Sequence, residues 1–204
     1  MTFEPTVFVV DDDEDARNSL CALVGSLGVQ AEAFSSAEEF LACCTAGRSG
    51  CLVTDICMMG MSGLDLQDRL AELEIELPVV VITAFPRTRS TVRAMAGGAV
   101  TLLEKPYAED ELWDAIRRAL TRDAAARAET ERRCVIKERA DLLTAAERTV
   151  MQMIVQGQPN KTIATQLNTS IRTIEGRRQK VFAKMGVESV AALVRLAIEG
   201  QLVE

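Results

Sequence analysis

Short apolar runs alternate with segments of helical periodicity over the first 120 residues of this 204-residue chain. Continuous apolar runs of this length are typical of parallel strands that are buried on both faces of a sheet. The alternation predicts strand–helix–strand units with right-handed crossovers, and therefore an α/β fold with an open, doubly wound parallel sheet. The five predicted strands are Val7–Val10, Val29–Phe34, Cys51–Thr54, Val79–Thr83 and Ala99–Leu103.

The segments between these strands carry apolar residues at the spacing of one helix face. We expect these residues to face the core, and the helices to cover both sides of the sheet. The five sets are Leu20, Leu23, Val24 and Leu27; Ala37, Phe40 and Leu41; Leu64, Leu66 and Leu70; Val92, Met95 and Ala96; and Leu112, Ile116 and Leu120.

The chain changes character after residue 121. Residues 122–141 are rich in alanine and charge and contain no Gly or Pro, which predicts a helical linker. Residues 142–204 contain no strand-like run and predict an all-α domain of four helices. The division is thus an α/β domain over 1–121, a linker over 122–141 and a helical domain over 142–204.

Capping residues predict where the four C-terminal helices begin. Thr144 with Glu147 forms a capping-box pattern, and Asn160, Ser170 and Ser189 can cap the helices that follow. The turn Asn168–Ser170 is short enough for a helix-turn-helix. The expected core positions of the last two helices are Ile171, Ile174, Val181 and Met185, then Val190, Leu193, Val194 and Ile198.

The net charge of −7, from 23 Lys+Arg and 30 Asp+Glu, argues at first against a nucleic-acid partner. The charge is unevenly distributed, however: residues 1–120 hold 9 basic and 20 acidic side chains, whereas residues 141–204 hold 8 and 6. The helical domain is therefore mildly basic, and nucleic acid stays open as its partner.

The chain has no histidine, which excludes Ser-His-Asp and Cys-His catalysis and mixed Cys/His zinc sites. Its six cysteines lack a C-x-x-C pair and are expected to be reduced thiols. No signal-peptide pattern and no apolar stretch of membrane-spanning length occurs. We therefore expect a cytoplasmic protein without a membrane partner.

Polar residues gather where four of the predicted strands end. Asp11–Asp13 follow the first strand, Asp55 ends the third, Thr83 ends the fourth, and Lys105 follows the fifth. The carboxyl ends of parallel strands form the ligand crevice of an open sheet, so these groups should converge. Converging carboxylates need a cation, and all-oxygen ligands suit Mg²⁺ or Mn²⁺. Taken singly, an acidic group at a strand end is more often part of a turn or a helix cap, and only the four strand ends together favour a ligand site.

These segments resemble the receiver domain of two-component response regulators. The resemblance rests on Val-Val-Asp-Asp-Asp at 9–13, Val-Thr-Asp-Ile-Cys-Met-Met-Gly-Met-Ser-Gly at 53–63, Ile-Thr-Ala at 82–84 and Glu-Lys-Pro at 104–106. It implies a flavodoxin-like fold in which Asp55 accepts a phosphoryl group from a sensor histidine kinase. It further implies that Mg²⁺ is held by Asp11, Asp12, Asp55 and the backbone carbonyl of Cys57, and that Thr83 and Lys105 contact the phosphoryl group.

The chain departs from this receiver pattern at three places. Met59 stands where the family usually has proline, and Phe85-Pro86 replaces polar residues after Thr83. Leu102 occupies the position of a commonly reorienting aromatic residue. An aromatic rotamer signal therefore cannot operate at Leu102.

The helix expected around Thr173–Lys184 has a polar face opposite its apolar positions. Such a face is either simply solvated or suited to DNA, with cations for phosphates and short or amide side chains for base edges. The outward stripe is Arg172, Glu175, Gly176, Gln179 and Ala183, flanked by Arg177, Arg178 and Lys180.

The C-terminal domain resembles the LuxR-type helix-turn-helix of the NarL/FixJ response regulators, and with the receiver it is most similar to the FixJ branch. The resemblance rests on Leu143–Glu147, Gly157–Ala164, Arg172–Glu175 and Lys184–Gly186. It implies base contacts from Glu175, Gly176 and Gln179, and phosphate contacts from Lys161, Arg172, Thr173, Arg177 and Lys180.

The leading hypothesis is a transcription regulator, not an enzyme, in which phosphorylation of Asp55 promotes homodimerisation and binding to double-stranded promoter DNA. One alternative is a haloacid-dehalogenase-type phosphatase with Asp11 as nucleophile and Asp13 as acid; it leaves Asp55 and the helical domain unexplained. Another alternative is a receiver that acts only through protein binding. Dimerisation fits the small positive charge of residues 141–204, because one such domain makes few phosphate contacts.

Overall fold

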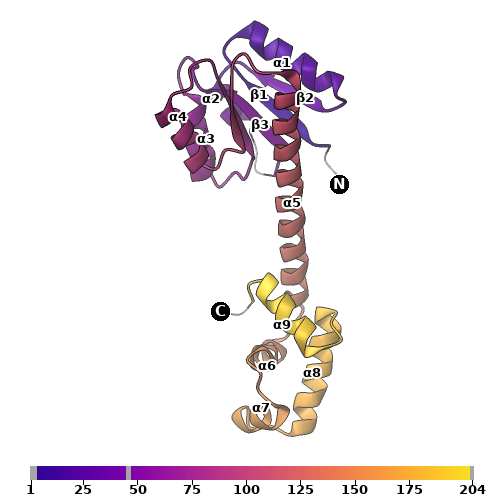
Figure 1. Ribbon diagram of the computed structural model, residues 1–204. Coiled ribbons are helices and arrows are strands. Elements are labelled where there is room, and N and C mark those ends of the chain that lie inside the picture. Colours follow the sequence, from indigo (N-terminus) through magenta and orange to yellow (C-terminus); the bar gives the residue numbers. More distant parts are fainter. Residues whose placement is uncertain (1–3, 45–46, 203–204) are drawn as a thin grey trace. The chain divides into compact units, whose positions relative to one another are not determined.

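The structure is a computed structural model that describes residues 4–44 and 47–202. The chain divides into two compact units, Met1–Ala126 and Arg127–Glu204, and helix α5 (Glu109–Asp141) contributes residues to both (Figure 1). No helix in the described part of the chain is long and apolar enough to cross a membrane.

The first unit is built on a parallel sheet with the strand order β2-β1-β3-β4-β5. This order confirms the predicted doubly wound, flavodoxin-like fold. The order reverses at β1, so the carboxyl ends of β1 and β3 are adjacent, with Val10 paired to Thr54. The strands are β1 (Thr6–Val10), β2 (Gln30–Phe34), β3 (Gly50–Asp55), β4 (Val79–Thr83) and β5 (Thr101–Glu104).

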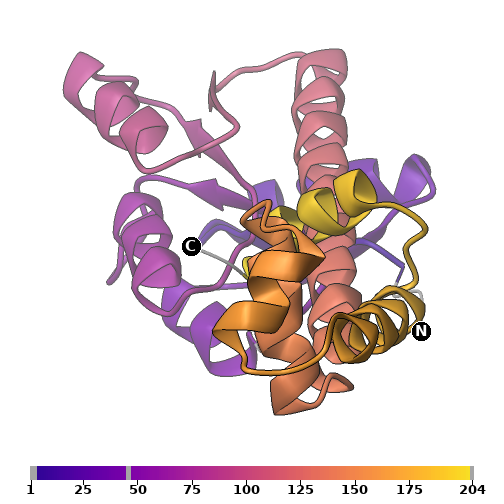
Figure 2. The same ribbon diagram turned by 90° about the horizontal axis from the view of Figure 1, so that it is seen from below.

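Alternate residues of each buried strand face opposite helical layers. Val7 and Val9 pack in one cluster with residues of α1 (Glu14–Ser26) and α5, whereas Phe8 and Val10 pack with residues of the other three helices. Figures 1 and 2 show α1 and α5 on one side of the sheet and the other helices on the opposite side. Those helices are α2 (Ala37–Cys43), α3 (Gly63–Glu72) and α4 (Thr88–Ala96).

Gly63 allows α3 to begin directly against the end of β3. A Cβ atom at this position would lie 2.1 Å from the backbone oxygen of Asp55 and 2.9 Å from the hydroxyl of Thr54. Only a residue without a side chain fits there, so Gly63 fixes the distance between α3 and Asp55.

The second unit is a helical domain with its own core. The helices are α6 (Ala145–Val155), α7 (Asn160–Gln166), α8 (Ile171–Met185) and α9 (Val190–Glu199). Their buried residues include Val150, Ile163, Ile174 and Leu193, and Ile136 of α5 belongs to the same cluster.

Residues 122–141, for which a linker is predicted, lie in α5 and join both units. Asp123 is buried in the first unit, where its carboxylate accepts hydrogen bonds from Gly50 N–H (2.9 Å) and Ser49 Oγ (3.0 Å). Ile136 and Ala140 are buried in the second. Both ends of this segment are therefore part of a packed domain.

Six residues with predicted core positions are exposed instead: Leu27, Val92, Met95, Ala96, Ile171 and Ile198. Leu27 follows α1 directly, and Ala96 is the last residue of α4. Helix α4 packs on the sheet through Ala94, which is fully buried, so the larger Val92 and Met95 point outward. Ile171 is the first residue of α8, and Ile198 lies in the last turn of α9. A residue at a helix end can keep the apolar spacing and still lie beyond the packed surface.

Three of the four predicted caps are present. Thr144 and Glu147 form a reciprocal capping box, while Ser170 and Ser189 accept hydrogen bonds from the N–H groups of Thr173 and Ala192. The prediction for Asn160 was wrong, because Asn160 is the first residue of α7 and the cap position is held by Pro159. The Asn160 side chain instead accepts a hydrogen bond from Arg178 (3.3 Å).

A partly buried ion pair connects α6 to the end of α8. Lys184 Nζ lies 2.6 Å from Glu147 Oε2 and also donates to the carbonyl of Leu142 at 2.9 Å. Hydrogen bonds from Lys184 and from the N–H of Thr144 lower the pKa of Glu147 from 4.5 to about 2. Glu147 therefore begins α6 and anchors α8 at the same time.

We expect Gly63→Ala to lower the free energy of unfolding by at least about 2 kcal/mol, because the added methyl group collides with backbone atoms of β3. Urea denaturation of the full chain measures the change. Gly25→Ala in α1 is the control, since a Cβ there meets nothing within 4 Å. Equal stability of the two variants would contradict this role of Gly63.

We expect Glu147→Gln to destabilise the second unit at neutral pH but not in acid. Because folding depresses the pKa of Glu147 to about 2, its ionised form stabilises the fold above pH 4.5, and this contribution is lost as the pH falls toward 2. Denaturation curves of wild type and variant should converge over that range. Glu188→Gln, which removes an exposed carboxylate, should show no such convergence. A difference between wild type and Glu147→Gln that is independent of pH would count against the ion pair.

Candidate functional site

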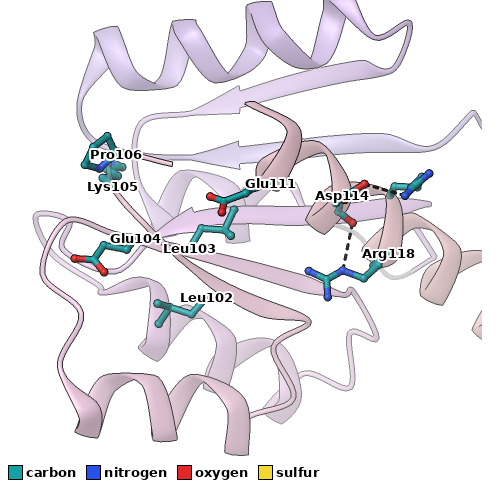
Figure 3. Close-up of a pocket in the computed structure, with 9 residues that line it drawn as sticks. Leu102, Leu103, Glu104, Lys105, Pro106, Glu111, Asp114 and Arg118 are labelled. Carbon is teal, nitrogen blue, oxygen red and sulfur yellow. Dashed lines mark hydrogen bonds and ion pairs between the residues drawn. The ribbon is translucent and has the colours of Figure 1, made fainter. Parts of the chain in front are cut away.

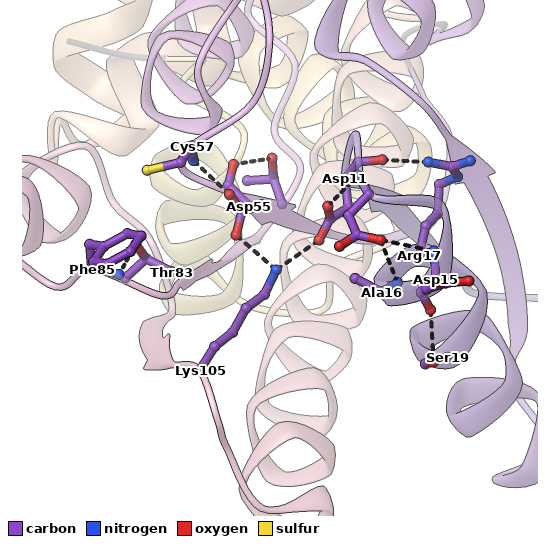
Figure 4. A network of polar contacts seen from close by, with 12 residues as sticks. Asp11, Asp15, Ala16, Arg17, Ser19, Asp55, Cys57, Thr83, Phe85 and Lys105 are labelled. Carbon is purple, nitrogen blue, oxygen red and sulfur yellow. Dashed lines mark hydrogen bonds and ion pairs between the residues drawn. The ribbon is translucent and has the colours of Figure 1, made fainter.

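The carboxyl edge of the sheet brings together two carboxylates and a lysine. Asp11 follows β1 and Asp55 ends β3, and both are buried. Lys105, directly after β5, places its Nζ 2.9 Å from Asp11 Oδ2 and 3.0 Å from Asp55 Oδ1 (Figure 4). The three groups that the sequence assigns to separate strand ends thus meet at one point.

Burial determines the electrostatics of this point. Burial raises the pKa of Asp55 above its usual value, although Lys105 and the N–H of Cys57 (2.6 Å) act in the opposite direction. Burial lowers the pKa of Lys105, but Asp11 and Asp55 more than offset this effect and raise it overall. A single lysine therefore does not fully compensate the negative charge taken out of water.

Asp12 is exposed and points to the loop after β3. Its Oδ2 accepts a hydrogen bond from the N–H of Met59 at 2.9 Å. The backbone of this loop therefore holds two carboxylates, Asp55 through Cys57 and Asp12 through Met59. In the described residues no group of three or more acidic or cysteine side chains is clustered closely enough to form a metal site. The carboxylates on this edge nevertheless match the oxygen donors that Mg²⁺ prefers.

Thr83 lies on the side of Asp55 opposite to Asp11 (Figure 4). It ends β4, is fully buried, and its hydroxyl accepts a hydrogen bond from the N–H of Phe85 at 3.2 Å. The Phe85 side chain is 71% exposed. The hydrogen bond from the N–H of Phe85 to this hydroxyl therefore connects the loop between β4 and α4 to the end of β4.

Asp13, the third acidic residue after β1, caps helix α1. Asp13 accepts hydrogen bonds from the N–H groups of Asp15 (2.9 Å) and Ala16 (3.2 Å) at the start of α1. Arg17 donates to the carbonyl of Asp11 at 2.7 Å, a contact that the sequence pattern did not reveal. The capping interpretation holds for Asp13, whose carboxylate is directed at the helix.

A hollow of about 710 Å³ lies beside Lys105, between β5 and the start of α5 (Figure 3). Most of its lining is charged, and Asp114 binds both Arg117 (2.8 Å) and, through its carbonyl, Arg118 (3.3 Å). No sequence pattern predicts this surface, because it forms only where α5 packs beside β5. The lining residues are Leu102–Pro106, Glu111, Asp114, Arg117 and Arg118.

The second unit presents one face of α8 to solvent. Ile174, Val181 and Met185 are fully buried and fix the orientation of the helix. Arg172, Glu175, Gln179 and Ala183 of the predicted stripe are exposed, and Gly176 is half-buried. Helix α7 precedes α8 by a four-residue turn, so the two form a helix-turn-helix.

The cations near this face differ in their availability. In ranges 4–44 and 47–202, the side chains of four of them make no hydrogen bond or ion pair with another residue: Lys161, Arg172, Arg177 and Lys180. Arg178 is bonded to Asn160 and lies 5.1 Å above the ring of Phe182. The Thr173 hydroxyl lies 2.8 Å from Ser170 Oγ in the cap of α8. Arg178 and Thr173 thus have partners within the domain.

A doubly wound sheet with acidic groups, a hydroxyl and a lysine at its carboxyl edge, joined to a helix-turn-helix domain, defines a phosphorylation receiver combined with a DNA-binding domain. Residues 7–117 match the family described as "Response regulator receiver domain", and residues 141–197 match "Bacterial regulatory proteins, luxR family". The chain therefore belongs to the two-component response regulators with a luxR-type DNA-binding domain, as the motifs predicted.

Its relatives match both domains. The chain is 40% identical over 195 residues to the transcriptional regulatory protein FixJ of Rhizobium meliloti, covering 96% of each chain. It is 36% identical to the response regulator protein TodT of Pseudomonas putida, covering 93% of this chain and 84% of that one.

Two solved structures of response regulators are similar to this chain in both sequence and fold. The response regulator StyR is 38% identical, with a TM-score of 0.87 over 97% of this chain and 100% of that chain. Full-length FixJ from B. japonicum is 33% identical, with a TM-score of 0.58 over 100% of both chains.

Proposed function

We propose that Asp55 is the phosphoacceptor of this response regulator and that a sensor histidine kinase is the donor. The contact of Asp55 with Lys105 on the carboxyl edge of the sheet carries this assignment. A carboxylate oxygen of Asp55 attacks phosphorus, the P–N bond of the phosphohistidine breaks, and the imidazole nitrogen keeps the electron pair. Lys105 neutralises charge on the phosphoryl oxygens.

Mg²⁺, or Mn²⁺ in its place, fits the oxygen donors beside Asp55. Asp11, Asp12, Asp55 and the backbone carbonyl of Cys57 would hold it. When bound, the ion neutralises charge on the phosphoryl oxygens. The chain's own part is to keep Asp55 desolvated and oriented through Cys57, and to keep Lys105 between the two carboxylates.

Thr83 connects this reaction to the surface. Its hydroxyl binds the N–H of Phe85 in the structure. By turning to a phosphoryl oxygen, the hydroxyl would release the loop that carries the exposed Phe85. Leu102, which is half-buried against the core, is not aromatic, so an aromatic rotamer switch cannot operate there. Loop repacking is therefore the proposed signal.

The output is binding to double-stranded promoter DNA through α8. Glu175, Gly176 and Gln179 face base edges, while Lys161, Arg172, Arg177 and Lys180 contact phosphates, with Thr173 and Arg178 beside them. Because residues 141–204 hold only two more basic than acidic side chains, a single domain binds weakly, and phosphorylation acts by forming a homodimer. Since its DNA partner is in the cytoplasm, we expect the protein to act there.

The domains of this proposal are a receiver over 1–121, a helical linker over 122–141 and a DNA-binding domain over 142–204. The protein is not a conventional enzyme in this scheme, and its relatives bear the names of regulators. In the phosphatase alternative Asp13 is the acid, but its carboxylate caps α1.

Asp55→Asn should abolish incorporation of label from radioactive acetyl phosphate, because an amide oxygen is not a nucleophile. Asp68→Asn, an exposed change on α3, is the control and should be labelled like wild type. If Asp55→Asn is labelled and Asp11→Asn is not, the phosphatase scheme with Asp11 as nucleophile takes precedence.

Arg177→Ala should weaken binding to a duplex selected from a random pool, and each lost phosphate contact should reduce the slope of log K against log[salt] by about 0.9. Arg195→Ala removes the same charge from an exposed position on α9 and should have little effect. Acetyl phosphate should tighten binding of the wild type. Equal binding with and without the donor contradicts the switch, and indifference to salt and to Arg177→Ala favours a receiver that binds only proteins.

A further inference from the structure

Gly176 lies in the interior of α8, five residues after the helix begins and nine before it ends. Glycine at such a position destabilises a helix by about 1 kcal/mol relative to alanine. Either the fold or a partner of α8 must therefore require glycine at this position.

The fold gives Gly176 no reason to be glycine. It is absent from the glycines with positive φ in the described residues, so any L-residue can adopt its backbone conformation. A Cβ atom at this position would meet nothing within 4 Å. Gly63 shows the contrast, because there a Cβ would lie 2.1 Å from a backbone oxygen. The helix also ends normally, at the left-handed Gly186.

The position of Gly176 points to a partner outside the chain. With 100° per residue, Gly176 lies about 180° around the helix from the buried Met185. Its neighbours on the helix surface, at spacings of three and four, are Arg172, Gln179 and Lys180, all exposed. The missing side chain therefore leaves a gap among long polar side chains, on the face opposite the core.

We propose that Gly176 is a specificity-determining residue, which brings the α8 backbone close to base edges in the major groove because it has no side chain. This inference rests on the proposed DNA binding through α8. Close approach allows Glu175 and Gln179, which lie before and after Gly176 along the helix, to reach base edges. A carboxylate accepts from the amino group of cytosine, and an amide pairs with adenine. The half-site should therefore contain these two bases where α8 enters the groove.

Gly176→Ala in the full chain separates a role in DNA binding from a role in the fold. The variant should unfold at a higher temperature than wild type, because alanine is the better helix former. Its Kd for the duplex selected with wild type should rise at least about tenfold, the size of one lost base contact. Gly176→Val, with a larger side chain on the same face, should bind more weakly still.

Gly25→Ala is the matched control, since Gly25 is also a helical glycine whose added Cβ meets nothing within 4 Å. It should not change the Kd for DNA. Repeating the selection with Gly176→Ala should change the enriched bases at the positions next to Glu175 and Gln179.

A Gly176→Ala protein that is more stable and binds the duplex as tightly as wild type overturns this inference but leaves the proposed function intact. A destabilised Gly176→Ala protein overturns it too, because the glycine would then serve the fold. If wild type itself selects no duplex, both the inference and the proposed function fail.

Discussion

Two carboxylates removed from water at one edge of a sheet repel each other, and this repulsion is the constraint on which the receiver unit depends. Parallel pairing of β1 and β3 forces Asp11 and Asp55 into that arrangement. Lys105 lies between them, and it comes from β5, two strands away from β3. Lys105 can therefore offset this repulsion only when the sheet is assembled through to β5, so the acidic edge depends on the complete fold.

The incomplete compensation of this charge is what makes the site responsive. Lys105 leaves the pKa of Asp55 raised, so an additional cation has a favourable place beside it. In the proposed reaction, an incoming phosphoryl group would bring negative charge that competes with Asp11 for Lys105. In this proposed reaction, the balance of these interactions would link the chemistry to the loops around the site. Thr83 and the Cys57–Met59 segment are the parts of those loops that hold polar groups of the site.

The sequence predicts well what depends on periodicity and on strand ends. The doubly wound parallel sheet, the meeting of Asp11, Asp55 and Lys105, and the burial of Ile174, Val181 and Met185 follow from such patterns. Prediction from the sequence fails where a contact between distant residues determines the role of a side chain. Asn160, for example, accepts a hydrogen bond from Arg178 of α8 instead of capping α7. Val92 and Met95 have the apolar spacing of a core face, but close packing through Ala94 reverses their orientation. The hydrogen bond between the Asp12 carboxylate and the N–H of Met59 depends on the conformation of the loop after β3, which residue spacing does not predict.

The bond between Met59 and Asp12 is made by the backbone, not by the methionine side chain. Nineteen of the twenty amino acids could supply this N–H, and only proline could not. A receiver with proline at this position thus lacks the donor and must leave its second acidic residue without this restraint. In this chain the same carboxylate has an internal competitor for any ligand that approaches it. Replacing proline by any other residue at this position therefore adds a hydrogen-bond donor that would compete with a cation for Asp12 in the proposed magnesium site, while every acidic side chain stays the same.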